Sequence, residues 1–123
     1  MNSKIVSVDS VISVRELIDE YIFKFKHTTY PVMSAGRVIG IINANSVKAV
    51  QREALLQTTV GSIVIPITDS LIVAPDETVS SAMQKILGNG IGRVLVLESG
   101  ELVGLISKTD ILNYLDLYNK LRA

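Results

Sequence analysis

The sequence predicts a mixed α/β (α+β) fold built from two similar βαββα repeats. Strand-like and helix-like segments follow one another as strand, helix, strand, strand, helix, and this order occurs twice. The glycine spacing Gly36-x-x-x-Gly40 recurs 64 residues later as Gly100-x-x-x-Gly104, with apolar residues in both copies. Each copy is too small to bury its sheet alone. We therefore expect the two copies to pack sheet against sheet as one folding unit.

The composition limits the functions that the chain can have. Of its 123 residues 48% are hydrophobic, but the longest apolar runs are far too short to cross a bilayer. Twelve basic and twelve acidic residues cancel, which disfavours non-specific nucleic-acid binding. Cysteine is absent, so the chain has no thiolate metal site, thiol nucleophile or disulfide. With no secretion signal visible, we expect a cytoplasmic location.

The first repeat is predicted over residues 1–58. A β-branched alternating segment at 4–8 is typical of a strand. Ser13-Val14-Arg15-Glu16 matches a capping box, and it opens a helix with one apolar face (Val14, Leu17, Ile18, Tyr21, Ile22 and Phe25). Strands at 30–33 and 38–42 follow, joined by a tight turn at 34–36. A short helix at 43–51 and a polar connection at 52–59 complete this half.

The second repeat is predicted over residues 59–123. A strand at 71–74 leads into a helix capped by Thr78, which ends at Gly88 and Gly90. Its apolar stripe consists of Val79, Ala82, Met83, Ile86 and Leu87. Strands at 93–97 and 101–106 form a hairpin around 98–100, and the last helix runs from 108 to about 120.

The polar end of the last strand is the strongest candidate for function. Ser107 and Asp110 flank the start of the last helix, where either can act as a cap. An aspartate there can also accept hydrogen bonds from both hydroxyls of a ribose, and nearby hydroxyl and N–H groups suit a phosphate. In the first repeat the same positions hold Asn43 and Ser46, and serine is too short to bind both hydroxyls.

These motifs resemble a known family. The pattern G-x-h-h-G followed by h-h-[ST]-x-x-D, where h is apolar, is similar to the CBS domain. Two copies in tandem resemble a CBS pair, or Bateman module, from about Lys4 to Tyr118. The resemblance implies two repeats related by a pseudo-two-fold axis. It also implies an adenosyl ligand, AMP or ATP, in the cleft between them as a regulatory ligand rather than a required cofactor.

One subgroup of CBS pairs is especially similar. Segments 13–17, 26–32 and 47–53 resemble the regulatory CBS pair that follows the membrane part of site-2-type intramembrane zinc metalloproteases. This implies a covalently linked membrane protease domain, with the present chain as its cytosolic part. No HExxH zinc motif occurs in the chain, so any protease chemistry lies outside it.

The resemblance also assigns ligand-contacting roles to individual residues. Asp110 would bind ribose, and Ser107, Thr109 and Arg93 would bind phosphate. Apolar strand residues would line an adenine slot, namely Ile72 and Val94, with Ile65 and Val96 as further candidates. Each assignment has a plain structural alternative: helix caps for the motif residues, an exposed arginine without a fixed partner, and ordinary core for the apolar residues.

Because the first repeat departs from the motif, we expect one competent nucleoside site and one degenerate site per pair. Asn43 and Asn45 are then expected to serve as caps. The single histidine, His27, is expected to interact with a helix C-terminus rather than a metal. Tyr114, Tyr118 and Leu121 on the last helix are expected to pack internally or to form a homodimer surface.

Three classes of function remain open. The first is a non-catalytic regulatory module whose ligand shifts how it packs with a partner. The second is a structural module that dimerises its host without a ligand. An enzyme is the third and least favoured class, because the sequence shows no nucleophile–base pair, metal cluster or phosphate-binding loop.

Overall fold

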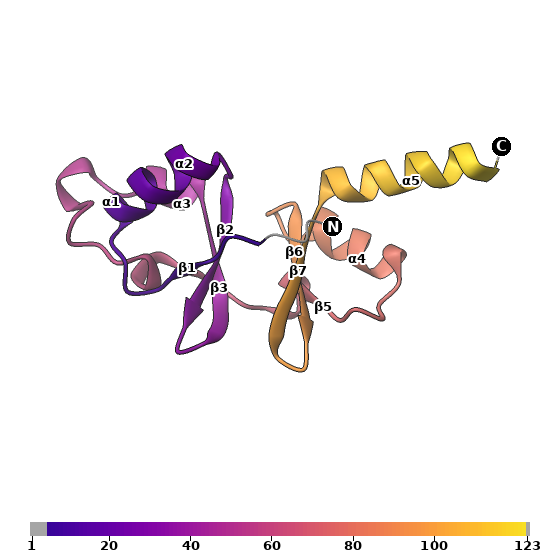
Figure 1. Ribbon diagram of the computed structural model, residues 1–123, viewed down its shortest axis with the longest axis horizontal. Coiled ribbons are helices and arrows are strands. Elements are labelled where there is room, and N and C mark those ends of the chain that lie inside the picture. Colours follow the sequence, from indigo (N-terminus) through magenta and orange to yellow (C-terminus); the bar gives the residue numbers. More distant parts are fainter. Residues whose placement is uncertain (1–4, 123) are drawn as a thin grey trace. The chain divides into compact units, whose positions relative to one another are not determined.

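The computed structural model describes residues 5–122, which divide into two compact units. The first is Val6–Ile67, and the described part of the second consists of Ile5 and residues 68–122. Each unit contains one small sheet with helices beside it (Figure 1). The mixed α/β class and the two similar repeats predicted from the sequence are confirmed.

The first unit holds a four-stranded sheet in the order β1-β2-β3-β4. Its strands are β1 (Val8–Asp9), β2 (Thr29–Ser34), β3 (Arg37–Asn43) and β4 (Ile65–Pro66). Its helical segments are α1 (Val14–Glu16), a π-helix (Leu17–Ile22), α2 (Phe23–Phe25), α3 (Ala44–Lys48) and 3-10 turns at Arg52–Ala54 and Val60–Ile63.

The second unit holds a three-stranded sheet in the order β5-β6-β7. Its strands are β5 (Ile72–Val73), β6 (Arg93–Glu98) and β7 (Glu101–Ser107). Its helical segments are a 3-10 turn (Asp69–Leu71), α4 (Val79–Gly88) and α5 (Lys108–Arg122).

The strand registers of β1-β2-β3 and β5-β6-β7 are equivalent. Val8 of β1 pairs with Val32 of β2, and Val73 of β5 pairs with Val96 of β6, both in parallel. A register shift follows Val32 in the first β-hairpin and Val96 in the second. The two sheets therefore share pairing, direction and bulge position.

The hairpin turns repeat as well. Ala35 and Gly36 have positive φ angles of 51° and 79°, and Ser99 and Gly100 have 52° and 83°. Two successive residues in the left-handed conformation form a two-residue turn whose twist matches that of the flanking strands. This conformation explains why a glycine occupies the second turn position in each repeat.

Each unit has its own hydrophobic core. The first core contains Val8, Leu17, Tyr30, Val32, Ile42 and Val60. The second contains Val73, Ala82, Ile86, Val94, Val96 and Ile111. Both cores form where the helices of the unit cover one face of its sheet.

The first predicted helix is present, with a local irregularity. The Ser13 hydroxyl accepts a hydrogen bond from the Glu16 N–H at 3.0 Å, as expected for its N-cap. A π-helical stretch then interrupts the α-helix, which periodicity alone does not reveal. Close to this stretch, the buried Tyr30 hydroxyl donates to the Tyr21 carbonyl at 3.0 Å.

Two strand predictions need correction, and one observed strand was not predicted. The strand predicted at 4–8 is observed only at Val8–Asp9, where β2 supplies a pairing partner; Lys4 lies outside the described residues. The strand predicted at 71–74 is likewise reduced to Ile72–Val73. Strand β4 was not predicted, because two residues, one of them Pro66, carry no alternation signal.

The segment after α3 packs in the first compact unit. Val60 is fully buried in the first core, and β4 pairs with β3 through Ile65 and Ile41. The contacts of residues 60–66 thus lie with the first sheet, although the sequence analysis counted them in the second repeat.

Candidate functional site

Strand β7 runs directly into helix α5, and a complete capping box forms at the junction. The Ser107 hydroxyl accepts from the Asp110 N–H at 3.2 Å. In return, the Asp110 carboxylate accepts from the Ser107 N–H at 2.8 Å and from its hydroxyl at 3.1 Å. Ser107 and Asp110 therefore stabilise the start of the helix.

The cap uses only one of the two carboxylate oxygens of Asp110. Both bonds from Ser107 reach Oδ2 of Asp110, and Oδ1 has no hydrogen-bond partner among residues 5–122. The side chain is half-buried rather than fully exposed. An ionised carboxylate oxygen in this position can accept hydrogen bonds from a ligand while the cap remains intact.

The sheet brings Arg93 to the same place. Arg93, the first residue of β6, lies directly opposite Ser107 in the antiparallel register with β7. The Gly92 carbonyl, one residue earlier, accepts from the Lys108 N–H at 3.0 Å. A guanidinium, a hydroxyl and a carboxylate thus share one end of the hairpin.

The two predicted adenine-slot residues lie on different faces of the sheet. Ile72 pairs with Leu95, and Leu95 alternates with Val94 along β6. Since successive side chains of a strand point to opposite faces, Ile72 lies on the face of Leu95 and Arg93. Val94 is 0% exposed and belongs to the core under the helices.

The other residues predicted to form the adenine slot are also separated. Val96 lies in the same core as Val94, and Ile65 belongs to β4 of the first unit. Within the second unit Arg93 therefore lies opposite Ser107, to which Asp110 is hydrogen-bonded, and Thr109 precedes Asp110 in α5. Ile72 shares the sheet face of Arg93, whereas Val94 and Val96 lie on the opposite face.

The first turn of α5 leaves few free donors. Hydrogen bonds to Gly92 and Ser107 occupy the N–H groups of Lys108 and Asp110. Thr109 lies between them; its side chain is exposed, as is that of Lys108. Any anion here would therefore rely on side chains more than on the helix N–H groups that the sequence analysis emphasised.

Asn89 organises the loop before Arg93, and the sequence analysis missed it. Its amide nitrogen donates to the carbonyls of Ser70 at 2.9 Å and Arg93 at 2.8 Å. Its amide oxygen accepts from the N–H groups of Ile91 at 2.8 Å and Gly92 at 3.2 Å. The signal in the sequence was an asparagine directly after the helix, followed by Gly-Ile-Gly.

The first repeat forms a cap at the equivalent positions with different chemistry. Oδ1 of Asn43 accepts from the Ser46 N–H at 2.9 Å and from its hydroxyl at 3.1 Å. Asn43 is the N-cap of α3, as predicted, whereas the exposed Asn45 lies inside the helix. No carboxylate is present at this junction.

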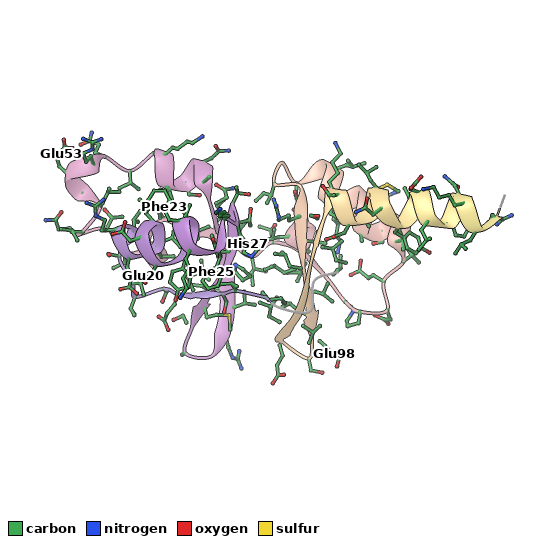
Figure 2. The ribbon with its side chains drawn as sticks, turned by 45° about the horizontal axis from the view of Figure 1, so that its top comes forward. Glu20, Phe23, Phe25, His27, Glu53 and Glu98 are labelled. Carbon is green, nitrogen blue, oxygen red and sulfur yellow. The ribbon has the colours of Figure 1, made fainter. Side chains whose placement is uncertain are left out.

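His27 lies in an aromatic group at the end of the first helix (Figure 2). Its ring stacks on Phe25 with centroids 6.5 Å apart and meets the edge of Tyr30 at 6.0 Å. Within residues 5–122 no three histidine or acidic side chains form a metal-binding group. Over the same residues, no helix is long and apolar enough to span a membrane.

A duplicated βαββα unit with a capped strand–helix junction defines a class of tandem α/β modules. Residues 1–52 and 60–117 match the CBS domain family, and the chain belongs to that family as a tandem pair.

Two curated relatives are named as zinc metalloproteases. Rip3 of Mycobacterium tuberculosis is 26% identical over 109 residues, which is 87% of this chain and 28% of Rip3. MJ0392 of Methanocaldococcus jannaschii is 28% identical over 112 residues, which is 91% of this chain and 30% of MJ0392. The chain thus spans less than a third of each relative and corresponds to their CBS regions.

Solved structures share the fold. The CBS-domain protein ATU1752 of Agrobacterium tumefaciens is 27% identical with a TM-score of 0.77, covering 92% of this chain and 90% of that one. The CBS domain of a bacterial CNNM/CorC family Mg2+ transporter, solved in complex with ATP, has a TM-score of 0.77 at 19% identity. The matched region covers 89% of this chain and 78% of the transporter chain.

Proposed function

We propose that the chain is a regulatory module that binds an adenine nucleotide, AMP or ATP, at the junction of β7 and α5. The observation that carries the proposal is the free Oδ1 of Asp110, beside an oxygen already held by the cap. Folding of the helix needs one oxygen, and the second remains available to a ligand. The ATP bound to the related transporter domain supports this ligand class.

Each side chain would have a distinct role. Asp110 would accept hydrogen bonds from the ribose hydroxyls. Arg93 and the Thr109 hydroxyl would bind phosphate, with Lys108 adding positive charge; the planar guanidinium suits phosphate oxygens. Ser107 would act mainly by fixing the Asp110 carboxylate through two hydrogen bonds.

The adenine ring would need an apolar surface next to these groups. Ile72 is half-buried and lies on the sheet face that carries Arg93, so it is our preferred contact. Val94 remains a candidate only through its backbone, because its side chain is packed among Ala82 and Ile86.

Regulation would act on a host protein. The relatives named as zinc metalloproteases suggest a metalloprotease as host. The resemblance found in the sequence would make that host a membrane protease with this chain on its cytosolic side. A nucleotide can shift such a host only by binding its two states with different affinities.

Calorimetric titration with AMP and with ATP tests this proposal. We expect saturable binding by the wild type. Asp110→Asn should weaken it about ten- to hundredfold, since the amide keeps one acceptor for the cap but loses the charge. Absence of binding by the wild type at millimolar nucleotide would refute the nucleotide proposal. Unchanged binding by Asp110→Asn would refute only the site.

A structural dimerisation role is the second candidate. Four residues at helical spacing on the outer half of α5 are exposed (Tyr114 49%, Leu117 56%, Tyr118 43% and Leu121 77%). Light scattering after size-exclusion chromatography would show a homodimer that Leu117→Lys dissociates, with or without nucleotide. A monomeric wild type at all tested concentrations would reject this candidate.

A further inference from the structure

One side chain, Asn89, connects two of the segments that carry the proposed nucleotide contacts. Its amide nitrogen donates to the Ser70 carbonyl at 2.9 Å, two residues before Ile72, and to the Arg93 carbonyl at 2.8 Å. Ile72 is the preferred contact for adenine, and Arg93 is the proposed contact for phosphate. Asn89 therefore joins the segments that would hold the two ends of the ligand.

The same amide fixes the loop that leads into Arg93. Its oxygen accepts from the N–H groups of Ile91 at 2.8 Å and Gly92 at 3.2 Å. Asparagine side chains commonly close turns in this way. Gly90 and Gly92 have φ angles of 76° and 78°, which few residues other than glycine adopt. The backbone before Arg93 thus has a defined path, although glycine itself restricts it little.

The loop is joined in turn to the segment that carries Asp110. The Lys108 N–H donates to the Gly92 carbonyl at 3.0 Å, two residues before Asp110. The proposed contacts for base, phosphate and ribose thus come from three separate segments. Each contact lies within two residues of a hydrogen bond made by Asn89 or by its loop.

The first unit closes the equivalent loop without an amide. The Thr28 carbonyl accepts from the Ala44 N–H at 3.0 Å, so Thr28 is the counterpart of Gly92 and Phe25 is that of Asn89. The Phe25 ring stacks on the nearby histidine ring, with centroids 6.5 Å apart. The fold can therefore connect this helix to the next strand without an asparagine. The amide occurs in the unit that also has the arginine and the carboxylate.

Asn89 also ends helix α4, which is the plain structural role of the residue. Its main-chain N–H donates to the Lys85 carbonyl at 2.9 Å. Ending the helix and closing the turn require only this bond and the amide oxygen. The two bonds from the amide nitrogen go beyond that role, because they reach a segment 19 residues away and the main chain of Arg93.

We infer that Asn89 is a positioning residue that makes the site prefer phosphorylated adenosine to adenosine itself. The inference rests on the proposed nucleotide function. By holding the main chain of Arg93 relative to Ile72 and Asp110, Asn89 keeps the guanidinium within reach of the phosphate of a bound nucleotide. A group held in place before binding loses less conformational freedom when the ligand arrives. Without the amide the loop glycines can move, and the phosphate then adds little to the affinity.

Calorimetric titrations with AMP and with adenosine test this role. We expect the wild type to bind AMP at least about tenfold more tightly than adenosine, and Asn89→Ala to reduce this preference to less than about threefold. Thr78→Ala is the matched control, because it removes the N-cap of α4 in the same unit without changing the loop. It should keep the wild-type preference. Equal loss of the preference in Thr78→Ala would overturn the inference, because stability alone would then explain the effect.

A double-mutant cycle separates positioning from stability. Arg93→Ala should weaken AMP binding at least about tenfold in the wild-type background but less than about threefold in the Asn89→Ala background. Asn89→Ser should behave like Asn89→Ala, since its hydroxyl can still accept within the turn but is too short to bridge to the Ser70 carbonyl. This second variant serves the same test if the alanine variant does not fold.

The outcomes distinguish this inference from the nucleotide proposal on which it rests. Independent losses in the cycle, or an AMP preference that both Asn89 variants keep, would overturn the inference alone. Equal binding of AMP and adenosine by the wild type would do the same. Absence of AMP and ATP binding by the wild type would refute the nucleotide proposal and this inference together.

Discussion

The two strand–helix junctions use the same pair of positions to cap a helix, but with exchanged chemistry. In the first repeat the amide of Asn43 accepts from Ser46, and in the second the carboxylate of Asp110 accepts from Ser107. The first junction shows that a neutral pair is sufficient for the cap. The charge and the spare oxygen of Asp110 are therefore not required by the fold, which makes them the better candidates for function.

A second difference concerns the ends of the repeats. The first compact unit includes Val60 in its core and β4 in its sheet, whereas a pocket lies beside Ala82 in the described part of the second unit. The same order of strands and helices thus gives two cores that are filled to different extents by the described residues. Each prediction below removes or exchanges one of these differences.

The largest effect is expected from Gly40→Ala. A β-carbon at Gly40 would collide with the Ile65 carbonyl oxygen and crowd Val64, so β4 must separate from β3. We expect the free energy of unfolding, measured with urea, to fall by about 3 kcal/mol. Gly88→Ala is the matched control, because an added methyl meets nothing there; it should change stability by less than about 0.5 kcal/mol. Similar losses in both variants would argue against closure by β4.

Exchanging the side chains at the two equivalent core positions should have unequal effects. Leu17→Ala removes a side chain that is 1% exposed and should cost about 3 kcal/mol of unfolding free energy. Ala82→Leu adds the same atoms beside an existing pocket and should change stability by less than about 1 kcal/mol. Urea titrations of both variants measure this, and a severe loss in Ala82→Leu would mean that the pocket cannot accept a side chain.

Removing each cap should have equal effects on stability and unequal effects on binding. Asn43→Ala and Ser107→Ala each delete a helix N-cap and should each cost about 1 kcal/mol in thermal or urea unfolding. Only Ser107→Ala should also weaken nucleotide binding, since it removes one of the two hydrogen bonds that orient the Asp110 carboxylate. If Asn43→Ala weakened nucleotide binding equally, the two junctions would not differ in function.

The smallest effect concerns pH. Hydrogen bonds from the Ser81 hydroxyl at 2.7 Å and the Ala74 N–H at 3.0 Å, with Lys85 nearby, lower the pKa of Glu77 below its usual 4.5. A lowered pKa in the folded state means that the unfolded state binds more protons in this range. The contribution of Glu77 is therefore complete above pH 4.5 and is lost as the pH falls through the folded-state pKa.

Glu77→Gln should consequently lose less stability than the wild type between pH 6 and pH 3 in urea titrations. The equivalent residue of the first repeat, Ile12, cannot titrate, so Ile12→Val serves as the control and should keep the wild-type slope. An identical pH slope for Glu77→Gln and wild type would contradict a role for Glu77 in acid stability.

Local sequence signals predicted most of the fold. The Ser13 and Thr78 caps, the turn glycines and the repeated glycine spacing each depend on neighbouring residues, and the structure confirms them. The extent of β1 and the existence of β4 depend on pairing partners distant in the chain, which short segments cannot reveal. The π-helix was missed for a different reason, because its residues keep an apolar face like that of an α-helix.

The candidate site was predicted in part. The Ser107–Asp110 motif is local, and its neighbour Arg93 follows from the hairpin register. Val94 illustrates the limit: an apolar strand residue can face the core or a ligand, and only the sheet decides which. Asn89 was missed although three of its four hydrogen bonds reach residues two to four positions away, and only the bond to the Ser70 carbonyl joins a distant segment.

The central claim is that the carboxylate of the second junction, and not the cap as such, makes a nucleotide site. The most direct measurement is the stoichiometry of AMP or ATP binding by calorimetry for wild type, Asp110→Asn and Asn43→Ala. We predict one site per chain in the wild type and in Asn43→Ala, and binding weakened at least tenfold in Asp110→Asn. Two sites in the wild type, or an affinity that depends on Asn43 and not on Asp110, would contradict the claim.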